Sequence, residues 1–297
     1  MDRRAQDLQH IRYACAQGVA HLVLSRPEKR NALGIGPGSM RDEIRTALQW
    51  ADHDDEVRCV VLTAEGDTFC GGGDLTGVAT PEGIAGDVAL VSQVDDFHRA
   101  VREVSKPVIA AVQGSCLGAG VGLVIQSDFV LAADDARFGL PEGRFGHPGG
   151  SELAAVVGPA WAKFLIFTGE SIDADQAVKC GLALMTIPRD RLLDRATELA
   201  ARIARMPKAS LMLNKRAVDT SVEASGRAAG RLAGRSIDTL TKVASHDAQA
   251  PDGRAFEDVL AADGVAGLKT AMNQQFTGSW LSTVVRPDSA AQEAGAR

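Results

Sequence analysis

Aromatic residues and excess positive charge are both scarce in this sequence. Phe, Trp and Tyr make up 4% of the 297 residues, and the formal net charge is −6. Proteins that bind single-stranded nucleic acid stack its bases on aromatic side chains, and proteins that bind nucleic-acid phosphates or anionic lipids carry an excess of basic residues. We therefore expect neither a nucleic acid nor a membrane surface as a partner.

Paired cysteines and long apolar segments are missing as well. The five cysteines form no CxxC pair, and an odd number argues against a disulfide framework. No apolar run reaches the ~20 residues that a membrane-spanning helix needs, and the charged N-terminus has no apolar signal segment. The sequence therefore predicts a cytoplasmic protein, without a membrane segment and without a metal site.

Glycine is plentiful, and much of it follows apolar runs. The run Pro107 to Val112 predicts a buried strand, and behind it come Gly114, Gly118, Gly120 and Gly122. An apolar run over residues 123–125 completes an order that predicts a strand, a glycine turn and a buried helix. Glycine lets a ligand approach the backbone closely. The free N–H groups of a first helical turn can then hold a negatively charged oxygen.

A second strand of the same kind precedes this one. Val57 to Thr63 predicts a buried strand, which leads to a turn at Gly71 to Gly73. Beyond this turn we expect a loop over residues 76–90 and a helix over residues 91–104. Residues 137–150 are rich in glycine and proline, and they predict a long loop of the kind that lines sites.

The order of the predicted elements divides the chain. Strands alternate with helices up to residue 206, and helices alone follow, which predicts an α/β fold with a helical appendage. Residues 1–206 would then form the core and residues 207–278 a helical C-terminal region. Residues 279–297 are small and polar, and we expect them to be disordered.

Six short segments carry a resemblance to a known family, and they occur in the family's order. Over residues 11–182 the chain resembles the crotonase, or enoyl-CoA hydratase/isomerase, superfamily. The matching segments are Arg26–Leu33, Phe69–Leu75, Lys106–Gly114, Leu117–Gly120, Phe138–Glu142 and Phe167–Leu182. Each segment alone is a weak match, but six in order over most of the chain make a specific one.

The resemblance implies a crotonase-like spiral of ββα turns with a helical C-terminal trimerisation region, assembled as a homotrimer or hexamer. Residues 1–206 would bind and transform an acyl-CoA thioester, with no cofactor beyond the coenzyme A that belongs to the substrate. In this family two backbone N–H groups hold the thioester oxygen, and by position these belong to Gly73 and Ala119. Removing a proton beside the thioester carbonyl makes an enolate, whose oxygen such donors stabilise.

Glu142 corresponds by position to a glutamate that moves protons in the family's hydratases. Its apolar neighbours Leu140 and Phe145 should raise its pKa, which suits a group that takes and returns a proton. The resemblance also implies substrate-binding roles for Lys29, Ala32, Gly71, Asp74, Leu75, Gly118 and Pro141. Of these, Lys29 is a candidate contact for a coenzyme A phosphate. For Asp74 we favour a structural role, in which its side chain holds the turn.

Gly122 is the main departure from the family pattern. Hydratases of the family carry a second glutamate at this position, so one carboxylate is missing here. His147 is a candidate second acid/base. Glu152 could supply a carboxylate, but the helix dipole alone explains an acidic residue at an expected helix start. Cys70 and Cys116 lie in the two glycine turns, and we interpret them as small buried residues.

One carboxylate with an oxyanion hole favours a proton shuttle. A single base can remove a proton beside the thioester and return it two carbons away, so we rank double-bond isomerisation first. The alternatives are hydration by an enoyl-CoA hydratase (a lyase), for which two carboxylates are better suited, and another enolate reaction such as hydrolysis or decarboxylation. A non-enzymatic acyl-CoA-binding protein is the remaining alternative. The acyl group and the choice between trimer and hexamer stay open.

Overall fold

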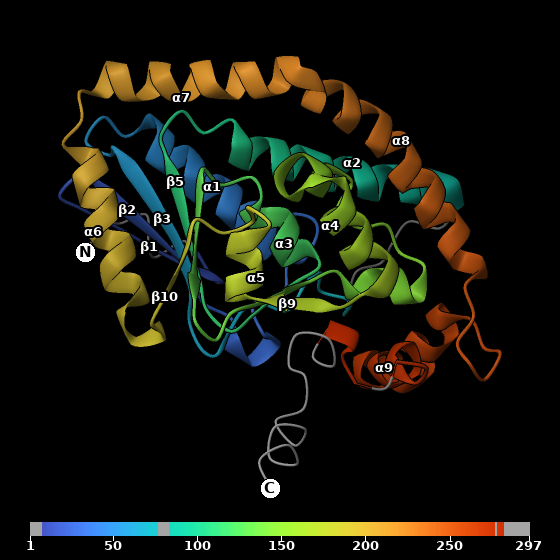
Figure 1. Cartoon of the computed structure of the whole chain (residues 1–297). Helices are drawn as coiled ribbons and strands as arrows, with labels where there is room; N and C mark the ends of the chain where they lie inside the picture. The colour runs from blue at the N-terminus through green and yellow to red at the C-terminus, as the bar shows by residue number, and fades with distance from the viewer. Residues whose placement is uncertain (1–7, 77–82, 277, 282–297) are drawn as a thin grey trace, which may run out of the picture.

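A six-stranded sheet forms the centre of the fold (Figure 1), and its strand order is β1-β2-β3-β5-β7-β10. The first two strands pair antiparallel, and all the others pair parallel. The strands are β1 Ile11–Ala16, β2 Val19–Leu24, β3 Cys59–Ala64, β5 Val108–Val112, β7 Phe129–Ala133 and β10 Met185–Ile187. The structure is a computed structural model, and it describes residues 8–76, 83–276 and 278–281.

A second, four-stranded sheet stands at the end of the first, with the order β4-β6-β8-β9. Its strands are β4 Thr68–Cys70, β6 Ser115–Leu117, β8 Arg137–Gly139 and β9 Ser171–Asp173. Three of them follow directly on strands of the large sheet, so that β3 leads to β4, β5 to β6 and β7 to β8. A helix follows each pair, and this repetition confirms the predicted spiral of ββα turns.

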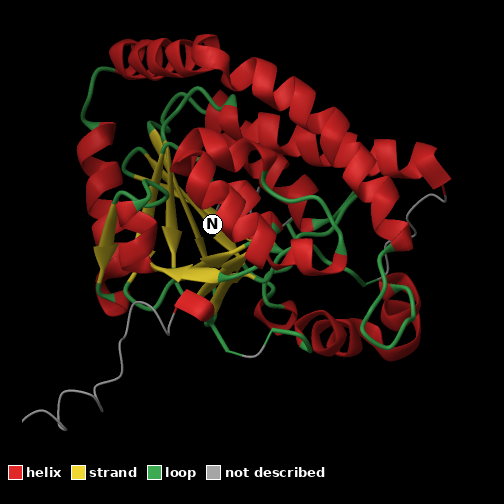
Figure 2. Ribbon diagram, turned by 45° about the vertical axis from the view of Figure 1, so that its right-hand side comes forward, coloured by secondary structure: helices red, strands yellow, loops and turns green. Residues whose placement is uncertain are grey.

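Helices cover both faces of the large sheet, as Figure 2 shows. Strands β3 and β5 are buried along nearly their whole length, as expected of parallel strands that are covered on both sides. One face packs against Leu192, Ala196 and Ala200 of α6. The helices of the core are α1 Met40–His53, α2 Gly83–Arg102, α3 Ala119–Val124, α4 Ala154–Thr168, α5 Ala174–Lys179 and α6 Leu192–Ala204.

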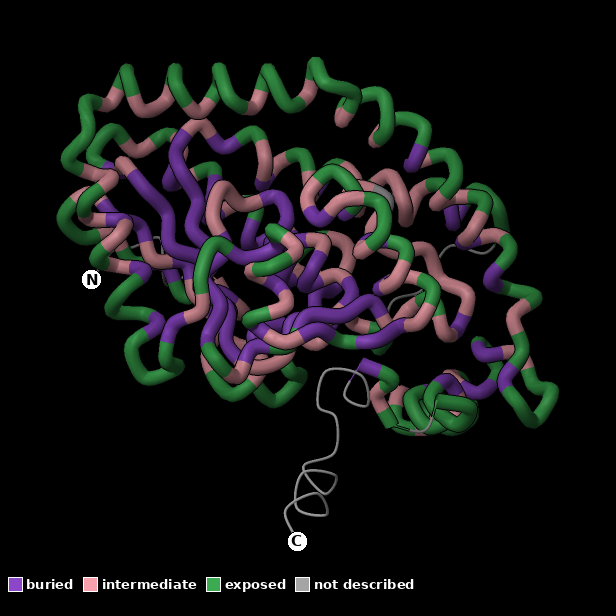
Figure 3. Tube along the Cα trace, in the orientation of Figure 1, coloured by how far each residue is buried: buried purple, intermediate pink, exposed green. Residues whose placement is uncertain are grey.

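The C-terminal region is helical, as predicted, and extends along one side of the core. Its helices are α7 Lys208–Val222, α8 Ala228–Ala244 and α9 Phe256–Asn273. Figure 1 shows α7 and α8 as one long arc, and Figure 3 shows this arc largely exposed. Large apolar side chains lie bare on it, among them Leu213, Val218, Leu232, Ile237 and Leu240. Trimerisation through this region stays a prediction.

Two local expectations differ from the structure. Helix α2 begins at Gly83, so the expected loop over residues 76–90 is wrong for its second half. Gly83 and Gly86 lower the local helix propensity, and packing against the rest of the fold outweighs this. At the C-terminus, Ser279 and Trp280 bind the Glu170 carboxylate through a hydroxyl and a backbone N–H. The disordered tail expected from residue 279 stays a prediction for residues 282–297, which lie outside the described residues.

None of the helices in the described ranges is both long and apolar enough to cross a membrane.

Candidate active site

The two glycine turns lie side by side at the ends of neighbouring strands. Strands β4 and β6 pair parallel, with Cys70 opposite Cys116, so the turns that follow them leave the sheet together. A β-carbon on Gly120 would lie 2.8 Å from the β-carbon of Cys70, and one on Gly72 would lie 3.4 Å from the Leu117 carbonyl oxygen. Gly120 therefore allows an approach that no larger residue permits. The two glycine turns therefore meet in space.

Each turn presents the backbone N–H that the resemblance singles out. Ala119 is the first residue of α3, where an N–H has no partner within the helix. Among the described residues, neither the Gly73 nor the Ala119 N–H donates a backbone–backbone hydrogen bond. The space where a Gly73 side chain would stand is open to 4 Å. These amides are available to a ligand, and their convergence on one oxygen stays a prediction.

Glu142 lies directly beside the second turn. It belongs to the 3-10 helix Pro141–Phe145, which follows β8, and β8 pairs with β6 so that Gly139 stands opposite Leu117. A β-carbon on Gly118 would lie 3.0 Å from Oε2 of Glu142, and one on Gly149 would lie 2.9 Å from Cγ. Both glycines thus leave room for this carboxyl group. Gly118 directly precedes Ala119, so the carboxyl group lies beside the residue before the donor.

The Glu142 carboxyl group is set up to exchange protons near neutral pH. Its Oε2 atom is buried and has no hydrogen-bond partner among the described residues. Burial away from water raises its pKa to about 7. Leu140 and Phe145, the expected apolar neighbours, are themselves buried. A carboxyl group with this pKa is present in both protonation states at neutral pH, as a group that takes and returns a proton requires.

The segment that contains Lys29 and Ala32 borders the first turn. The Gly71 N–H donates to the Arg30 carbonyl (2.8 Å) and the Leu33 N–H to the Gly72 carbonyl (2.9 Å). Lys29 itself is exposed at the end of the 3-10 helix Pro27–Lys29. A solvent-exposed lysine beside the turn is placed as a contact for a charged substrate group would be. That contact stays a prediction.

Asp74 holds the first turn through its side chain, in the structural role that we favoured. One carboxylate oxygen pairs with the Arg26 guanidinium at 2.7 Å. The other accepts hydrogen bonds from the Thr76 N–H (2.9 Å) and hydroxyl (2.6 Å). Burial alone would raise the pKa of Asp74, but these donors outweigh it and lower the pKa. The carboxylate therefore stays ionised and fixes the loop that follows Gly73.

His147 lies close to Glu142, and its ring packs against Phe145. Its backbone N–H donates to the Glu142 carbonyl (3.0 Å), and its ring lies 4.4 Å from the Phe145 ring. Burial lowers its pKa to about 4. The next largest influences are Lys242 of α8, which lowers the pKa, and Glu257 of α9, which raises it. An acid/base role for His147 stays a prediction.

The cysteines of the glycine turns are inert small residues, as interpreted from the sequence. Cys70 and Cys116 are fully buried. Burial raises the pKa of Cys70 to about 11 and the pKa of Cys116 well above its ordinary value. Both thiols are therefore protonated at neutral pH and are poor nucleophiles.

His98 is a residue that the sequence did not reveal. It lies near the C-terminal end of α2, and its imidazole occupies the space beside Gly122. A β-carbon on Gly122 would lie 2.9 Å from Nε2 of His98. The position where the family pattern has a second glutamate is thus taken by an imidazole from another helix. The linear sequence carries no signal for this contact, because it depends on how α2 crosses α3.

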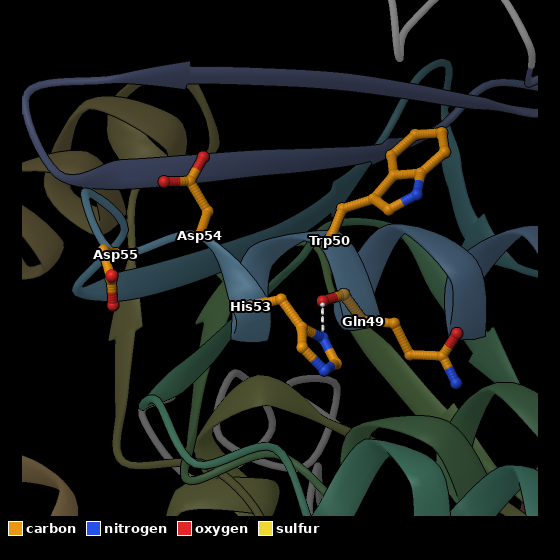
Figure 4. Close-up of a pocket in the computed structure, with 5 residues that line it drawn as sticks. All are labelled: Gln49, Trp50, His53, Asp54 and Asp55. Carbon is orange, nitrogen blue, oxygen red and sulfur yellow. Dashed lines mark hydrogen bonds between the residues drawn. The ribbon is translucent and has the colours of Figure 1, made fainter.

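A surface pocket at the end of α1 is separate from this site. It is lined by Gln49, Trp50, His53, Asp54 and Asp55 (Figure 4). The His53 ring bonds to the Gln49 carbonyl of the same helix (2.8 Å). None of the predicted site residues lines this pocket, so it adds nothing to the chemistry of the glycine turns.

Comparisons with known proteins place the chain in a family. The sequence profile of the enoyl-CoA hydratase/isomerase family matches residues 14–252. A probable enoyl-CoA hydratase of Mycobacterium tuberculosis is 35% identical over 201 residues, which are 66% of this chain and 76% of that protein. The 1,2-epoxyphenylacetyl-CoA isomerase of Escherichia coli is 34% identical over 214 residues, which are 69% of this chain and 80% of that protein.

Comparison with solved structures points to the same family. The crystal structure of an enoyl-CoA hydratase/isomerase from Xanthobacter autotrophicus Py2 matches with a TM-score of 0.84 at 30% identity, over 91% of this chain and all of that one. An enoyl-CoA hydratase from Mycobacterium smegmatis matches with a TM-score of 0.79 at 26% identity, over 93% of this chain and 96% of that one. With its spiral of ββα turns and its paired glycine turns, the chain belongs to the enoyl-CoA hydratase/isomerase family of crotonase-superfamily enzymes.

Proposed function

We propose that this enzyme acts on acyl-CoA thioesters by proton transfer beside the thioester carbonyl, through an enolate. Among the reactions of such an enolate, we rank double-bond isomerisation first. The observation that carries this proposal is Glu142. Its carboxyl group is buried beside Gly118, and its pKa is raised to about 7. The Ala119 N–H, which we assign to the thioester oxygen, is in the same turn.

The proposed reaction uses these groups in sequence. The Gly73 and Ala119 N–H groups hold the thioester oxygen, and the loss of one such donor typically lowers a rate by about 10²–10³. Ionised Glu142 takes a proton from C2 of a 3-enoyl thioester, and negative charge moves onto the held oxygen. Glu142 then gives the proton back at C4. One carboxyl group is sufficient, because the double bond moves without any addition of water.

Hydration is the second candidate, and a specific observation favours it. Nε2 of His98 fills the space beside Gly122, so a second group that can interact with water is present although the second glutamate is not. Relatives of similar identity do not separate the two reactions. One is the epoxyphenylacetyl-CoA isomerase described above, and another is named 2,3-dehydroadipyl-CoA hydratase.

The test compares wild type with Glu142→Gln on a 3-enoyl-CoA and on a 2-enoyl-CoA. We expect Glu142→Gln to lose nearly all turnover on both substrates through kcat while it still binds the thioester, because the oxyanion donors are untouched. Wild type that hydrates the 2-enoyl thioester but shows no isomerisation would overturn our ranking. A Glu142→Gln enzyme that keeps most of its activity would overturn the assignment of the base.

Assembly, cofactor use and location complete the proposal. The bare apolar side chains of α7 and α8 support a homotrimer or hexamer, in which they would be covered. The chemistry requires no cofactor beyond the coenzyme A of the substrate, because proton transfer needs no redox or metal centre. All five cysteines are free thiols, which supports a cytoplasmic location.

A further inference from the structure

Two side chains from different parts of the chain face one turn of α3. The Gly122 N–H donates to the Gly118 carbonyl at 3.1 Å, so one hydrogen-bonded turn joins the two glycines. A β-carbon on Gly118 would meet the Glu142 carboxyl, and one on Gly122 would meet Nε2 of His98. Glu142 and His98 therefore each lie against a glycine of the turn that also supplies the Ala119 donor.

From this arrangement we propose that His98 is a second catalytic residue, which gives the site a hydratase activity in addition to isomerisation, and that Glu152 is its positioning residue. The inference rests on the proposed function, since it assumes the same thioester and the same Glu142.

The imidazole of His98 is neutral at neutral pH, so it has a free acceptor nitrogen. However, the burial that keeps it neutral also makes it a weak base that must pass an accepted proton on at once. Burial, followed by the charges of Arg41 and Arg102, lowers its pKa to about 3, so the ring is neutral at pH 7. A neutral ring has one nitrogen that accepts and one that donates. Nδ1 lies 4.0 Å from Oε1 of Glu152. At this distance the two atoms form no hydrogen bond. It is the negative charge alone that favours the tautomer with its proton on Nδ1, which leaves Nε2, the atom beside Gly122, as the acceptor.

Glu152 is itself held in place by two arginines. Arg102 reaches its carboxylate at 3.1 Å and Arg227 at 3.6 Å, and only 8% of the Glu152 side chain is exposed. Arg102 also donates to Oε1 of Gln126 at 2.8 Å. Glu152 therefore places a fixed negative charge on the Nδ1 side of the His98 ring. The sequence makes Glu152 a candidate for the missing carboxylate, and in the structure the side chain beside Gly122 is that of His98.

The proposed step balances as follows. Nε2 of His98 takes a proton from a water molecule while the water oxygen bonds to C3 of a 2-enoyl thioester. The C2–C3 π bond breaks, its electrons move toward the thioester oxygen, and protonated Glu142 gives its proton to C2. The step leaves Glu142 ionised and His98 protonated. His98 then loses its proton to solvent and Glu142 gains one, which restores the starting state.

The test measures hydration of a 2-enoyl-CoA and isomerisation of a 3-enoyl-CoA side by side in His98→Gln. A general base contributes about 10²–10⁴ to a rate, so we expect the ratio of hydration to isomerisation to fall at least tenfold. His53→Gln, a change of an exposed histidine on α1, is the matched control and should keep the wild-type ratio. For Glu152→Gln we expect a smaller fall in the same ratio, a quantity that a purely structural role would not change.

A double variant tests the place as well as the residue. Gly122→Glu alone must push His98 aside, since its β-carbon would lie 2.9 Å from Nε2. His98→Ala/Gly122→Glu has the room, and we expect it to recover hydration relative to His98→Ala. An unchanged ratio in His98→Gln would overturn the inference and leave isomerisation by Glu142 intact. Wild type that neither isomerises nor hydrates would instead overturn the proposed function.

Discussion

Replacing Glu142 by Gln should stabilise the protein, by an amount that grows as the pH rises from 4.5 through 7. Burial raises the pKa of Glu142 from 4.5 to about 7. Gln is close in shape to the protonated carboxyl group but never carries charge. A raised carboxyl pKa means that ionisation opposes folding, so wild type loses stability as the pH rises from 4.5 through 7.

The size of the effect follows from the shift. Each unit of pKa corresponds to about 1.4 kcal/mol, so the ionised carboxylate costs about 3 kcal/mol at pH 8 and less than ~1 kcal/mol at pH 5. Urea unfolding of both proteins at these two pH values measures the difference directly. The difference in unfolding free energy between Glu142→Gln and wild type should increase by about 2–3 kcal/mol from pH 5 to pH 8.

Glu152→Gln is the contrasting control. It removes a paired carboxylate from between Arg102 and Arg227, and breaking a buried ion pair typically destabilises by about 3–5 kcal/mol. The two substitutions are chemically identical, yet they should shift stability at pH 8 in opposite directions. The reasoning about Glu142 is refuted if Glu142→Gln is less stable than wild type at pH 8, or if its advantage is the same at both pH values.

Two further predictions concern the pH profile and the turn at Gly114. Because the ionised form of Glu142 is the base, kcat/KM for isomerisation should rise about tenfold per pH unit below pH ~7 and level off above it; a flat profile from pH 5.5 to 8 would contradict this. Gly114→Ala should destabilise by at least ~3 kcal/mol, since its φ is +56° and its β-carbon would stand 1.9 Å from the Asp67 carbonyl oxygen. Gly36→Ala, at φ +91° with open space around it, should show the milder effect of strain alone in the same urea titration.

The sequence predicted the elements whose pattern is local. Strands β3 and β5 correspond to the apolar runs Val57 to Thr63 and Pro107 to Val112, where buried strands are expected. Glu142 and the two turns followed from motifs that the family keeps together. The start of α2 did not follow, because its glycines favour a loop locally and only packing makes it helical.

His98 marks the limit of such reasoning most clearly. Its own segment was expected to be helical, and the structure agrees. Nothing in that segment indicates which surface of α2 meets α3, because the crossing of the two helices is set by the whole core. Gly122 was seen as a missing carboxylate, whereas its lack of a side chain is what lets the imidazole approach. A vacancy in one motif can thus be filled by a residue far away in the chain.

The repetition of ββα turns divides the proposed chemistry among separate units. The turn after β4 presents Gly73, the turn after β6 presents Ala119, and the segment after β8 presents Glu142. The donors of the first two units are backbone groups, which survive almost any exchange of side chains. Of these three groups, Glu142 alone is a side chain, and the proposed second base, His98, belongs to the helix that follows the first turn. Substitutions in the loop after β8 can therefore change the acid/base group, and with it the reaction. The two turns that present the backbone donors need not change.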